Sequence, residues 1–139
     1  MYDYAIRFEE DPSAAGLAVY CRDLPELNSF GDDRAHAITE TLDAIDTTLS
    51  LYVDDRRAIP PASAAEAGEH VVHLPTVTVA KIVLWNEMVR RGMRKADLCR
   101  LLEVNPVQVD FLHTSKMEQL EAALAALGLR LSVSVLAAA

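Results

Sequence analysis

The hydrophobic pattern of the chain changes its period near Gly31, and this change most constrains the fold. From Tyr2 to Glu9 apolar and polar residues alternate, which is typical of a strand buried on one face. Turn-forming residues follow, and residues 17–22 again have the pattern of a strand. Residues 27–30 suit a third short strand before Gly31. We therefore predict that the chain begins with a β-hairpin and a third strand.

After Gly31 the apolar residues recur at steps of three and four, as they do along one face of an α-helix. Asp32 or Asp33 is a suitable N-cap for this helix. Its apolar stripe consists of Ala35, Ile38, Leu42, Ile45, Leu49 and Tyr52. Only the first strands are near enough to bury the stripe, so we expect the helix to lie across their sheet.

A connection of small and polar residues ends this first part of the chain. Two prolines follow Ile59 and prevent the helix from continuing, so residues 59–70 are predicted to be an exposed connection. Residues 71–74 then suit an edge strand of the same sheet. The first domain therefore has the order β-β-β-α-β and is expected to span residues 1–75.

Residues 76–139 are predicted to form an all-α domain with a C-terminal strand, which makes the fold class α+β. Thr78 is a candidate cap for a helix that stops at Gly92, and further helices are expected at 94–102 and 106–113. A capping box at residues 115–118 opens a fourth helix, which Gly128 closes. Residues 129–135 alternate as a strand does. Such a strand has no partner within a helical domain, so we expect it to pair with its copy in a second chain.

The stretch KADLCRLLEVNPVQVDFLH, residues 95–113, has the spacing of a helix-turn-helix motif. Leu98 and Cys99 form the packing pair of the first helix, and Val109 and Leu112 face back from the second. Glu103 stands at the turn position that usually carries glycine, where the backbone often has a positive φ. Many helical pairs in proteins that do not bind DNA share this spacing. A dimerisation module with solvated charges therefore remains the alternative.

If the motif binds DNA, its second helix enters the major groove. Asn105 and Gln108 then suit adenine edges, Val107 lies among them, and basic side chains hold phosphates. The predicted DNA-binding residues are Arg94, Lys95, Asn105, Val107, Gln108 and Lys116.

Charge is divided between the two halves of the chain. Residues 1–70 contain 15 acidic and five basic side chains, whereas residues 71–139 contain six acidic and eight basic ones. The acidic half repels phosphate and attracts basic partners, and the mildly basic half is able to approach nucleic acid. This division of charge suggests that the two halves of the chain have different functions.

Nothing in the sequence favours catalysis, a metal or a cofactor. Four carboxylates could be imagined as a two-metal site, but we expect them on solvent-exposed faces of their strand and helix; they are Asp3, Glu9, Glu40 and Asp43. The four histidines have no metal-binding spacing, and no glycine-rich phosphate loop occurs. Cys21 and Cys99 suit buried thiols in a reducing compartment. With no secretion signal or membrane span either, we expect a cytoplasmic protein that is not an enzyme.

The order of these features resembles the HicB antitoxin family over nearly the whole chain. Several short motifs carry the resemblance together: YAIRFEED at 4–11, GLAV at 16–19, DLPEL at 23–27, FGDDRA at 30–35, IPPAS at 59–63 and LEAALAALG at 120–128. Relatives usually have a longer stretch after the recognition helix and often have Arg where Phe111 stands.

This resemblance implies a partial ribonuclease-H-like first domain that has lost catalysis and that binds a small basic toxin of the HicA type, an mRNA-cleaving ribonuclease. It also implies a second domain that dimerises and binds operator DNA, so that the operon is autorepressed. For the toxin we propose contacts from the solvent-exposed edge of the sheet and from the turn around residues 23–33, with Asp23, Glu26, Asp32 and Asp33 as the contact residues. Two alternatives remain open at this point: a stand-alone transcription regulator with a non-catalytic acidic sensor domain, and a catalytically live nuclease.

Overall fold

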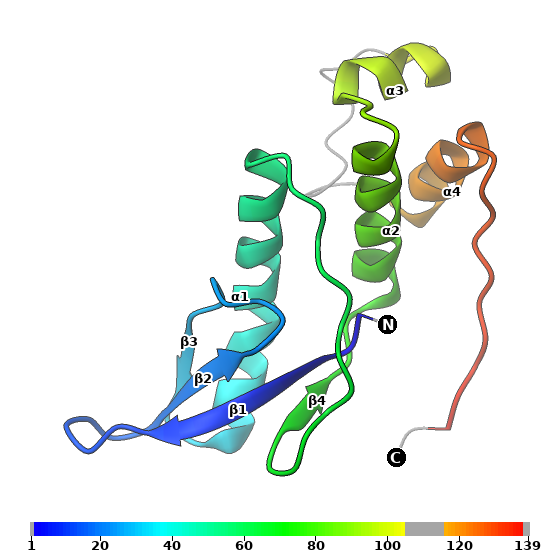
Figure 1. The fold of residues 1–139 in the computed structure, drawn as a ribbon. Helices are drawn as coiled ribbons and strands as arrows, with labels where there is room; N and C mark the ends of the chain where they lie inside the picture. The colour runs from blue at the N-terminus through cyan, green and yellow to red at the C-terminus, as the bar shows by residue number, and fades with distance from the viewer. Residues whose placement is uncertain (1, 105–115, 138–139) are drawn as a thin grey trace. The chain divides into compact units, whose positions relative to one another are not determined.

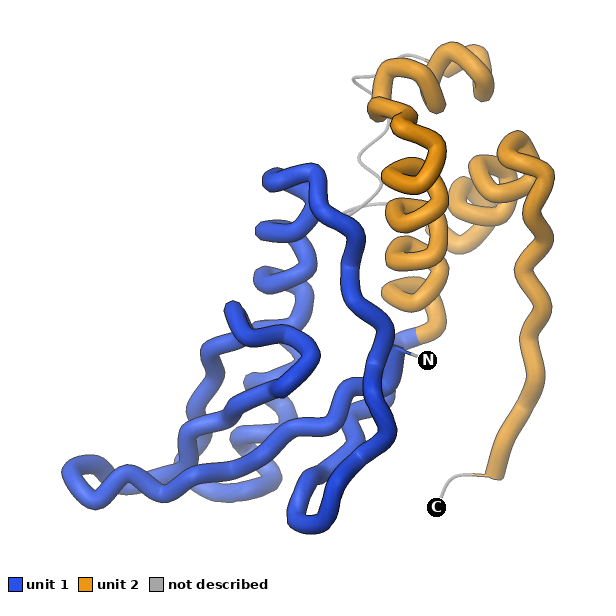
Figure 2. The backbone as a smooth tube through the Cα atoms, in the orientation of Figure 1, with its two compact units in different colours: residues 1–75 blue, residues 76–139 orange. Residues whose placement is uncertain are grey.

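A computed structural model describes residues 2–104 and 116–137. The chain divides into two compact units, Met1–Pro75 and Thr76–Ala139 (Figure 2).

The first unit is a four-stranded antiparallel sheet with one long helix (Figure 1). Its elements are β1 (Tyr4–Glu10), β2 (Leu17–Cys21), β3 (Ser29–Gly31), α1 (Arg34–Asp54) and β4 (His70–Val72). The strands lie in the order β3-β2-β1-β4, which leaves β3 and β4 at the two edges. The predicted β-β-β-α-β order is confirmed.

The register of the strands separates a buried face of the sheet from an open one. Ile6 lies opposite Cys21, and Phe8 lies opposite Val19. Residues that are directly opposite in an antiparallel pair share a face, so these side chains point to the helix side. Tyr20 lies opposite Arg7 on the other face and is 47% exposed. The alternating side chains of β1 and β2 therefore point to a buried face and an open face of the sheet, as predicted.

Helix α1 begins where the sequence indicates, but it buries a different stripe. The Asp33 side chain caps it by accepting a 2.8 Å hydrogen bond from the His36 backbone N–H. The predicted stripe is partly wrong, because Ala35 is exposed. The buried residues of α1 are Ala37, Thr41, Ile45, Thr48, Leu49 and Tyr52. Two threonines can be buried because each hydroxyl donates to the backbone carbonyl four residues earlier, at 2.6 and 2.8 Å.

Gly31 allows β3 and α1 to approach closely. A Cβ atom built on Gly31 would lie 2.2 Å from the backbone nitrogen of Ala37 and 2.4 Å from its Cα. No side chain fits there, so glycine at this position sets the packing distance between the edge strand and the helix.

The second unit contains α2 (Thr76–Arg90), α3 (Lys95–Leu102) and α4 (Met117–Ala126). A single apolar cluster holds them together, and its buried members are Ala80, Leu84, Met88, Leu98, Leu120, Ala123, Leu124 and Leu127. The predicted helix at 106–113 lies outside the described residues.

The ends of these helices confirm some predictions and correct others. Gly92 and Gly128 have φ values of 64° and 78°, as expected for residues that end helices. Thr78 is not a cap, because α2 begins two residues earlier and Thr78 is buried within it. Helix α4 begins at Met117, and the Gln119 side chain accepts from the Lys116 backbone N–H at 3.0 Å.

The predicted C-terminal strand is not formed within the chain. Residues 129–137 have no strand assignment, and Val133, Val135 and Leu136 are 71%, 96% and 85% exposed. A strand needs a hydrogen-bonding neighbour, and the sheet of the described residues contains only the four strands of the first unit.

Candidate functional site

The four acidic residues predicted to bind the toxin differ in whether their carboxylates accept hydrogen bonds from the protein itself. The Asp23 carboxylate accepts from the Ser63 backbone N–H at 2.8 Å and from its hydroxyl at 2.6 Å. Glu26 accepts from the Tyr52 hydroxyl at 2.6 Å, and Asp33 caps α1. The side chain of Asp32 is 87% exposed, and its carboxylate lies 3.6 Å from Nδ1 of His36. The structure therefore ties three of these carboxylates to its own backbone or side chains and leaves Asp32 facing solvent.

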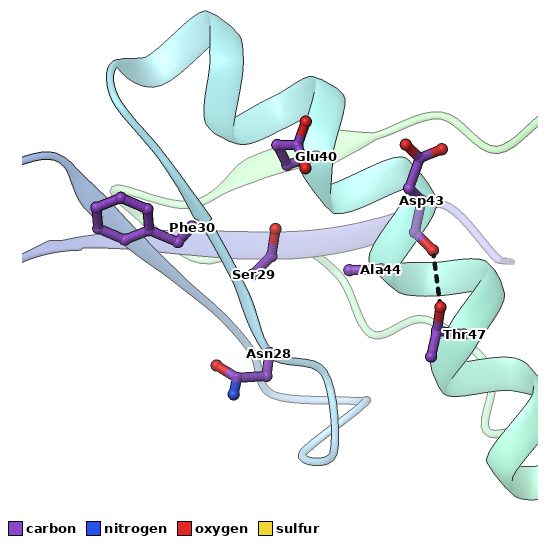
Figure 3. Close-up of a pocket in the computed structure, with 7 residues that line it drawn as sticks. All are labelled: Asn28, Ser29, Phe30, Glu40, Asp43, Ala44 and Thr47. Carbon is purple, nitrogen blue, oxygen red and sulfur yellow. Dashed lines mark hydrogen bonds between the residues drawn. The ribbon is translucent and has the colours of Figure 1, made fainter.

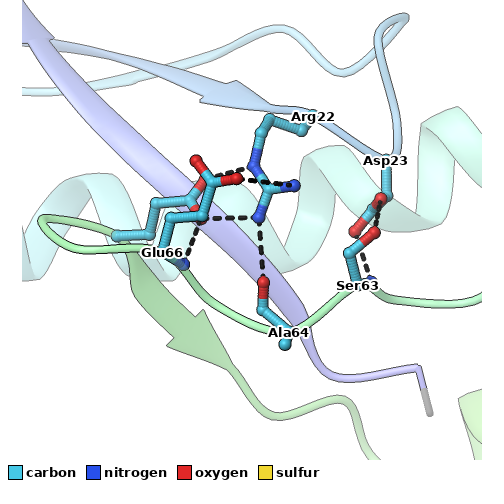
Figure 4. A network of polar contacts seen from close by, with 6 residues as sticks. Arg22, Asp23, Ser63, Ala64 and Glu66 are labelled. Atoms are coloured by element: carbon cyan, nitrogen blue, oxygen red, sulfur yellow. Dashed lines mark hydrogen bonds and ion pairs between the residues drawn. The ribbon is translucent and has the colours of Figure 1, made fainter.

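A clamp that the sequence does not predict holds the connection before β4 against the end of β2 (Figure 4). The Arg22 guanidinium donates to both carboxylate oxygens of Glu69, at 2.9 and 2.7 Å, and to the Ala64 carbonyl at 3.0 Å. These bonds lower the pKa of Glu69 to about 2. The partners are more than 40 residues apart, so no local pattern signals them. The connection is exposed for most of its length, as predicted, but it is held in place.

A second anchor joins the turn after β2 to the end of α1. Glu26 accepts from Tyr52 and, at 3.1 Å, from Arg57, whose guanidinium lies 4.3 Å from the centre of the Tyr52 ring. The hydrogen bond from Tyr52 lowers the pKa of Glu26. Burial, followed by the same bond, raises the pKa of Tyr52 to about 12. These contacts fix the shape of the acidic turn.

A hollow of about 460 Å³ lies beside the edge strand β3 (Figure 3). Asn28, Ser29 and Phe30 contribute one wall, and the middle turns of α1 contribute the other. The residues from α1 are Glu40, Asp43, Ala44 and Thr47. Ser29 points toward the helix, whereas the Phe30 ring projects to the open face of the sheet and is 44% exposed. The hollow thus combines two carboxylates with an unpaired strand edge.

In the second unit, the basic side chains differ in whether they form ion pairs with other described residues. Glu87 binds Arg90 at 2.5 Å and Arg91 at 2.7 Å, and these bonds lower its pKa to about 2. Asp97 pairs with Arg100. The predicted DNA-binding residues Arg94, Lys95 and Lys116 are exposed, and none has an ion pair with another described residue. Asn105, Val107 and Gln108 lie outside the described residues.

The Arg94 and Lys116 backbones stand at the beginnings of helices. Arg94 is the N-cap residue of α3, Lys95 is its first residue, and Lys116 is the N-cap residue of α4. Backbone N–H groups and the positive end of the helix dipole meet at such positions, which suits anions.

The turn after α3 has the backbone expected of a helix-turn-helix. Glu103 has φ 56° and ψ 39°, in the left-handed region, and the Val104 N–H returns to the Cys99 carbonyl at 3.0 Å. Leu98 and Cys99, the predicted packing pair, are 0% and 1% exposed. Glu103 therefore adopts the positive φ that this turn position often requires, although it is not glycine. Cys21 and Cys99 are both buried free thiols, as expected.

Neither a metal group nor a membrane helix is found in the part of the chain that the structure describes. No three His, Cys, Asp or Glu side chains there are grouped so as to hold a metal ion. No helix among these residues has the length and hydrophobicity needed to cross a bilayer.

Comparison with known proteins identifies the family. The family model described as HicB_like antitoxin of bacterial toxin-antitoxin system matches residues 3–83. Antitoxin HicB of Pseudomonas fluorescens (strain Pf0-1) is 43% identical, over 99% of this chain and 97% of its own length. The chain belongs to the HicB-like antitoxin family. Antitoxin HicB 2 of Photorhabdus laumondii is 35% identical over 94% of each chain, and Antitoxin HicB of Escherichia coli (strain K12) is 26% identical over 85% of this one.

Membership in the HicB-like family confirms the resemblance inferred from the short motifs. The matched region contains every strand and the helix of the first unit, together with the clamp, the acidic turn and the hollow, and it ends within α2. The full-length relatives extend the similarity across α3 and α4.

Proposed function

We propose that this antitoxin binds and occludes a small basic HicA-type ribonuclease through residues 1–75 and represses its own operon through residues 76–139. The observation that carries the proposal is the charge of the first region, 15 acidic side chains against five basic ones among residues 1–70. A surface of one sign speeds encounter with a partner of the opposite sign. The chain itself has no catalytic role in this proposal, and it acts in the cytoplasm.

The proposed toxin contacts are Asp23, Glu26, Asp32 and Asp33. Asp32 is free to meet a basic side chain directly, since it is exposed. Asp23, Glu26 and Asp33 shape the turn through the hydrogen bonds described above and present their remaining lone pairs. The first unit in this proposal is a partial ribonuclease-H-like domain, which its three antiparallel strands followed by a helix support.

The test of toxin binding is titration calorimetry with the basic protein encoded beside this gene, inactivated at its catalytic residue. We expect a stable complex that weakens as salt is raised, because exposed charges are screened. No heat of binding and no co-elution on gel filtration would overturn the proposal. If the chain then still bound its own promoter, it would instead be a stand-alone regulator with an acidic sensor domain.

We propose that the second unit is a helix-turn-helix domain that binds the operator. Arg94, Lys95 and Lys116 supply phosphate contacts, and Asn105, Val107 and Gln108 face the bases. Support comes from the exposed, unpaired cations of the described residues and from the left-handed turn at Glu103. The test is fluorescence anisotropy with promoter DNA across a salt series.

Matched variants separate base from phosphate contacts in that assay. Lys116→Ala is expected to weaken binding to all sequences and to reduce the salt slope by about 1, whereas Gln108→Ala reduces sequence preference. Arg56→Ala removes the same charge from an exposed position in the first unit, outside both the motif and residues 129–135, and serves as the control. Equal behaviour of all three variants would leave residues 95–113 as a scaffold for dimerisation.

We also propose that residues 129–135 pair with the same segment of a second copy and so form a homodimer. Its exposed valines and its alternating pattern support this, because an apolar extended segment without a neighbour is expected to associate. Light scattering after gel filtration is expected to give twice the chain mass for the wild type. Val133→Asp should give a monomer, and an unchanged dimer would contradict this assignment.

A further inference from the structure

The open edge of β3 is a place where the sheet is unfinished. The strand order puts β3 at one end of the sheet, with β2 on one side and no strand of the described residues on the other. The backbone groups of a strand alternate between its two edges, so part of those in Ser29–Gly31 face outward. An edge of this kind accepts an extended segment of another chain.

The chemistry beside this edge indicates what kind of segment fits. Glu40 and Asp43 lie on α1 and line the hollow beside β3 (Figure 3). Among the described residues, the ion-pair contact of Glu40 is with His36, whose Nε2 lies 3.4 Å away and which is charged only when protonated, and no Lys or Arg pairs with Asp43. Two carboxylates without a strong cation favour the Arg or Lys side chain of a partner.

The opposite face of the edge is apolar. The Phe30 ring is 44% exposed and lies on the open face of the sheet, where Ala18 is its neighbour on β2. Side chains of an added strand would point alternately to the two faces. One face therefore suits an apolar residue against Phe30, and the other suits a basic residue in the hollow.

We propose that an extended basic segment of the toxin adds a strand to β3 and places an Arg or Lys side chain between Glu40 and Asp43. This inference rests on the proposed function, because it takes the partner to be a basic protein. It assigns the edge contact to one strand, β3, and adds the hollow beside it to the recognition site. The length of β3, three residues, limits the added strand to a short one.

The test compares two charge reversals on the same helix. Asp43→Lys places a positive charge in the hollow, whereas Asp46→Lys makes the same change at an exposed position outside it. Affinity for the inactivated toxin encoded beside the gene is measured by calorimetry. We expect a loss of about 10-fold or more for Asp43→Lys and less than about 3-fold for Asp46→Lys, because only the first brings like charges together at close range.

Hydrogen exchange on the unmutated complex tests strand addition without any variant. The backbone amides of Ser29–Gly31 that face away from β2 are expected to exchange more slowly in the complex than in the free chain. If the complex forms but these amides are unchanged, or if both reversals weaken it equally, the inference fails and the antitoxin function stands. If the wild type does not bind the toxin, the proposed function fails, and this inference with it. If Asp43→Lys instead disrupts self-association, the edge binds a second copy of the chain.

Discussion

Replacement of Glu103 by glycine is expected to stabilise the second unit. Glu103 has φ 56° and ψ 39°, a conformation in which the Cβ of an L-residue crowds the following carbonyl and costs about 1–2 kcal/mol. Glycine removes that cost. It also raises the conformational entropy of the unfolded chain, which offsets about 0.4–1 kcal/mol of the stabilisation. We therefore expect Glu103→Gly to raise the free energy of unfolding by about 0.5–1 kcal/mol.

Urea unfolding followed by Trp85 fluorescence measures this change locally. Trp85 is the single tryptophan of the chain, and it packs against the apolar cluster of the second unit. With a urea dependence of about 1–2 kcal/mol per molar for a small domain, the midpoint should rise by roughly 0.3–1 M. Glu103→Ala is the control, because it removes the same carboxylate and keeps the strained backbone.

The comparison has a clear contrary result. If Glu103→Ala stabilises the unit as much as Glu103→Gly, the gain comes from removing charge and not from relief of the left-handed turn. If Glu103→Gly lowers the midpoint, Glu103 is not under backbone strain, and the turn geometry described here is wrong.

Three further variants test the packing and electrostatics. Gly31→Ala should destabilise the first unit by about 1–3 kcal/mol in thermal unfolding followed by circular dichroism, since its Cβ would collide with the Ala37 backbone; an unchanged midpoint would refute that close approach. Leu124→Ala, at a side chain that is 1% exposed, should cost about 2–5 kcal/mol in the Trp85 assay, and a loss below about 1 kcal/mol would place it outside the core. Because Arg22 binds Glu69, the pKa of Glu69 in the folded chain is about 2, below the ordinary 4.5. The contribution of Glu69 to the free energy of unfolding is therefore present above pH 4.5 and is lost as the pH falls toward 2. Glu69→Gln should therefore lose less stability than the wild type across that acid range, and identical acid curves would show that the clamp is not formed in solution.

Local periodicity predicts most elements of the first unit because each strand and helix has one buried face. The alternation in residues 2–9 and the cap at Asp33 depend only on neighbours in sequence, and both are confirmed. The stripe of α1 is rotated from the hydropathy pattern, since Thr41 and Thr48 become apolar in effect once their hydroxyls bond to the helix backbone. A scale that treats threonine as polar cannot anticipate this.

Long-range polar contacts are the part of the site that sequence does not predict. Arg22 and Glu69 are 47 residues apart, and Asp23 and Ser63 are 40 apart, so their pairing follows from the tertiary fold. The hollow beside β3 likewise depends on how α1 packs against a strand edge. The left-handed residue at Glu103, by contrast, has a local signal, because Glu103 lies at the position after Cys99 that usually carries glycine in a helix-turn-helix motif.

The central claim, that this HicB-like chain neutralises a basic ribonuclease by occlusion, is tested most directly by an RNA-cleavage titration. The active toxin encoded beside the gene is mixed with an RNA substrate, and the chain is added in increasing amounts. We expect cleavage to fall in proportion to added chain and to stop once each toxin has a partner, with inhibition relieved at high salt. Undiminished cleavage at a several-fold excess of chain, under conditions where the chain is folded, would contradict the account.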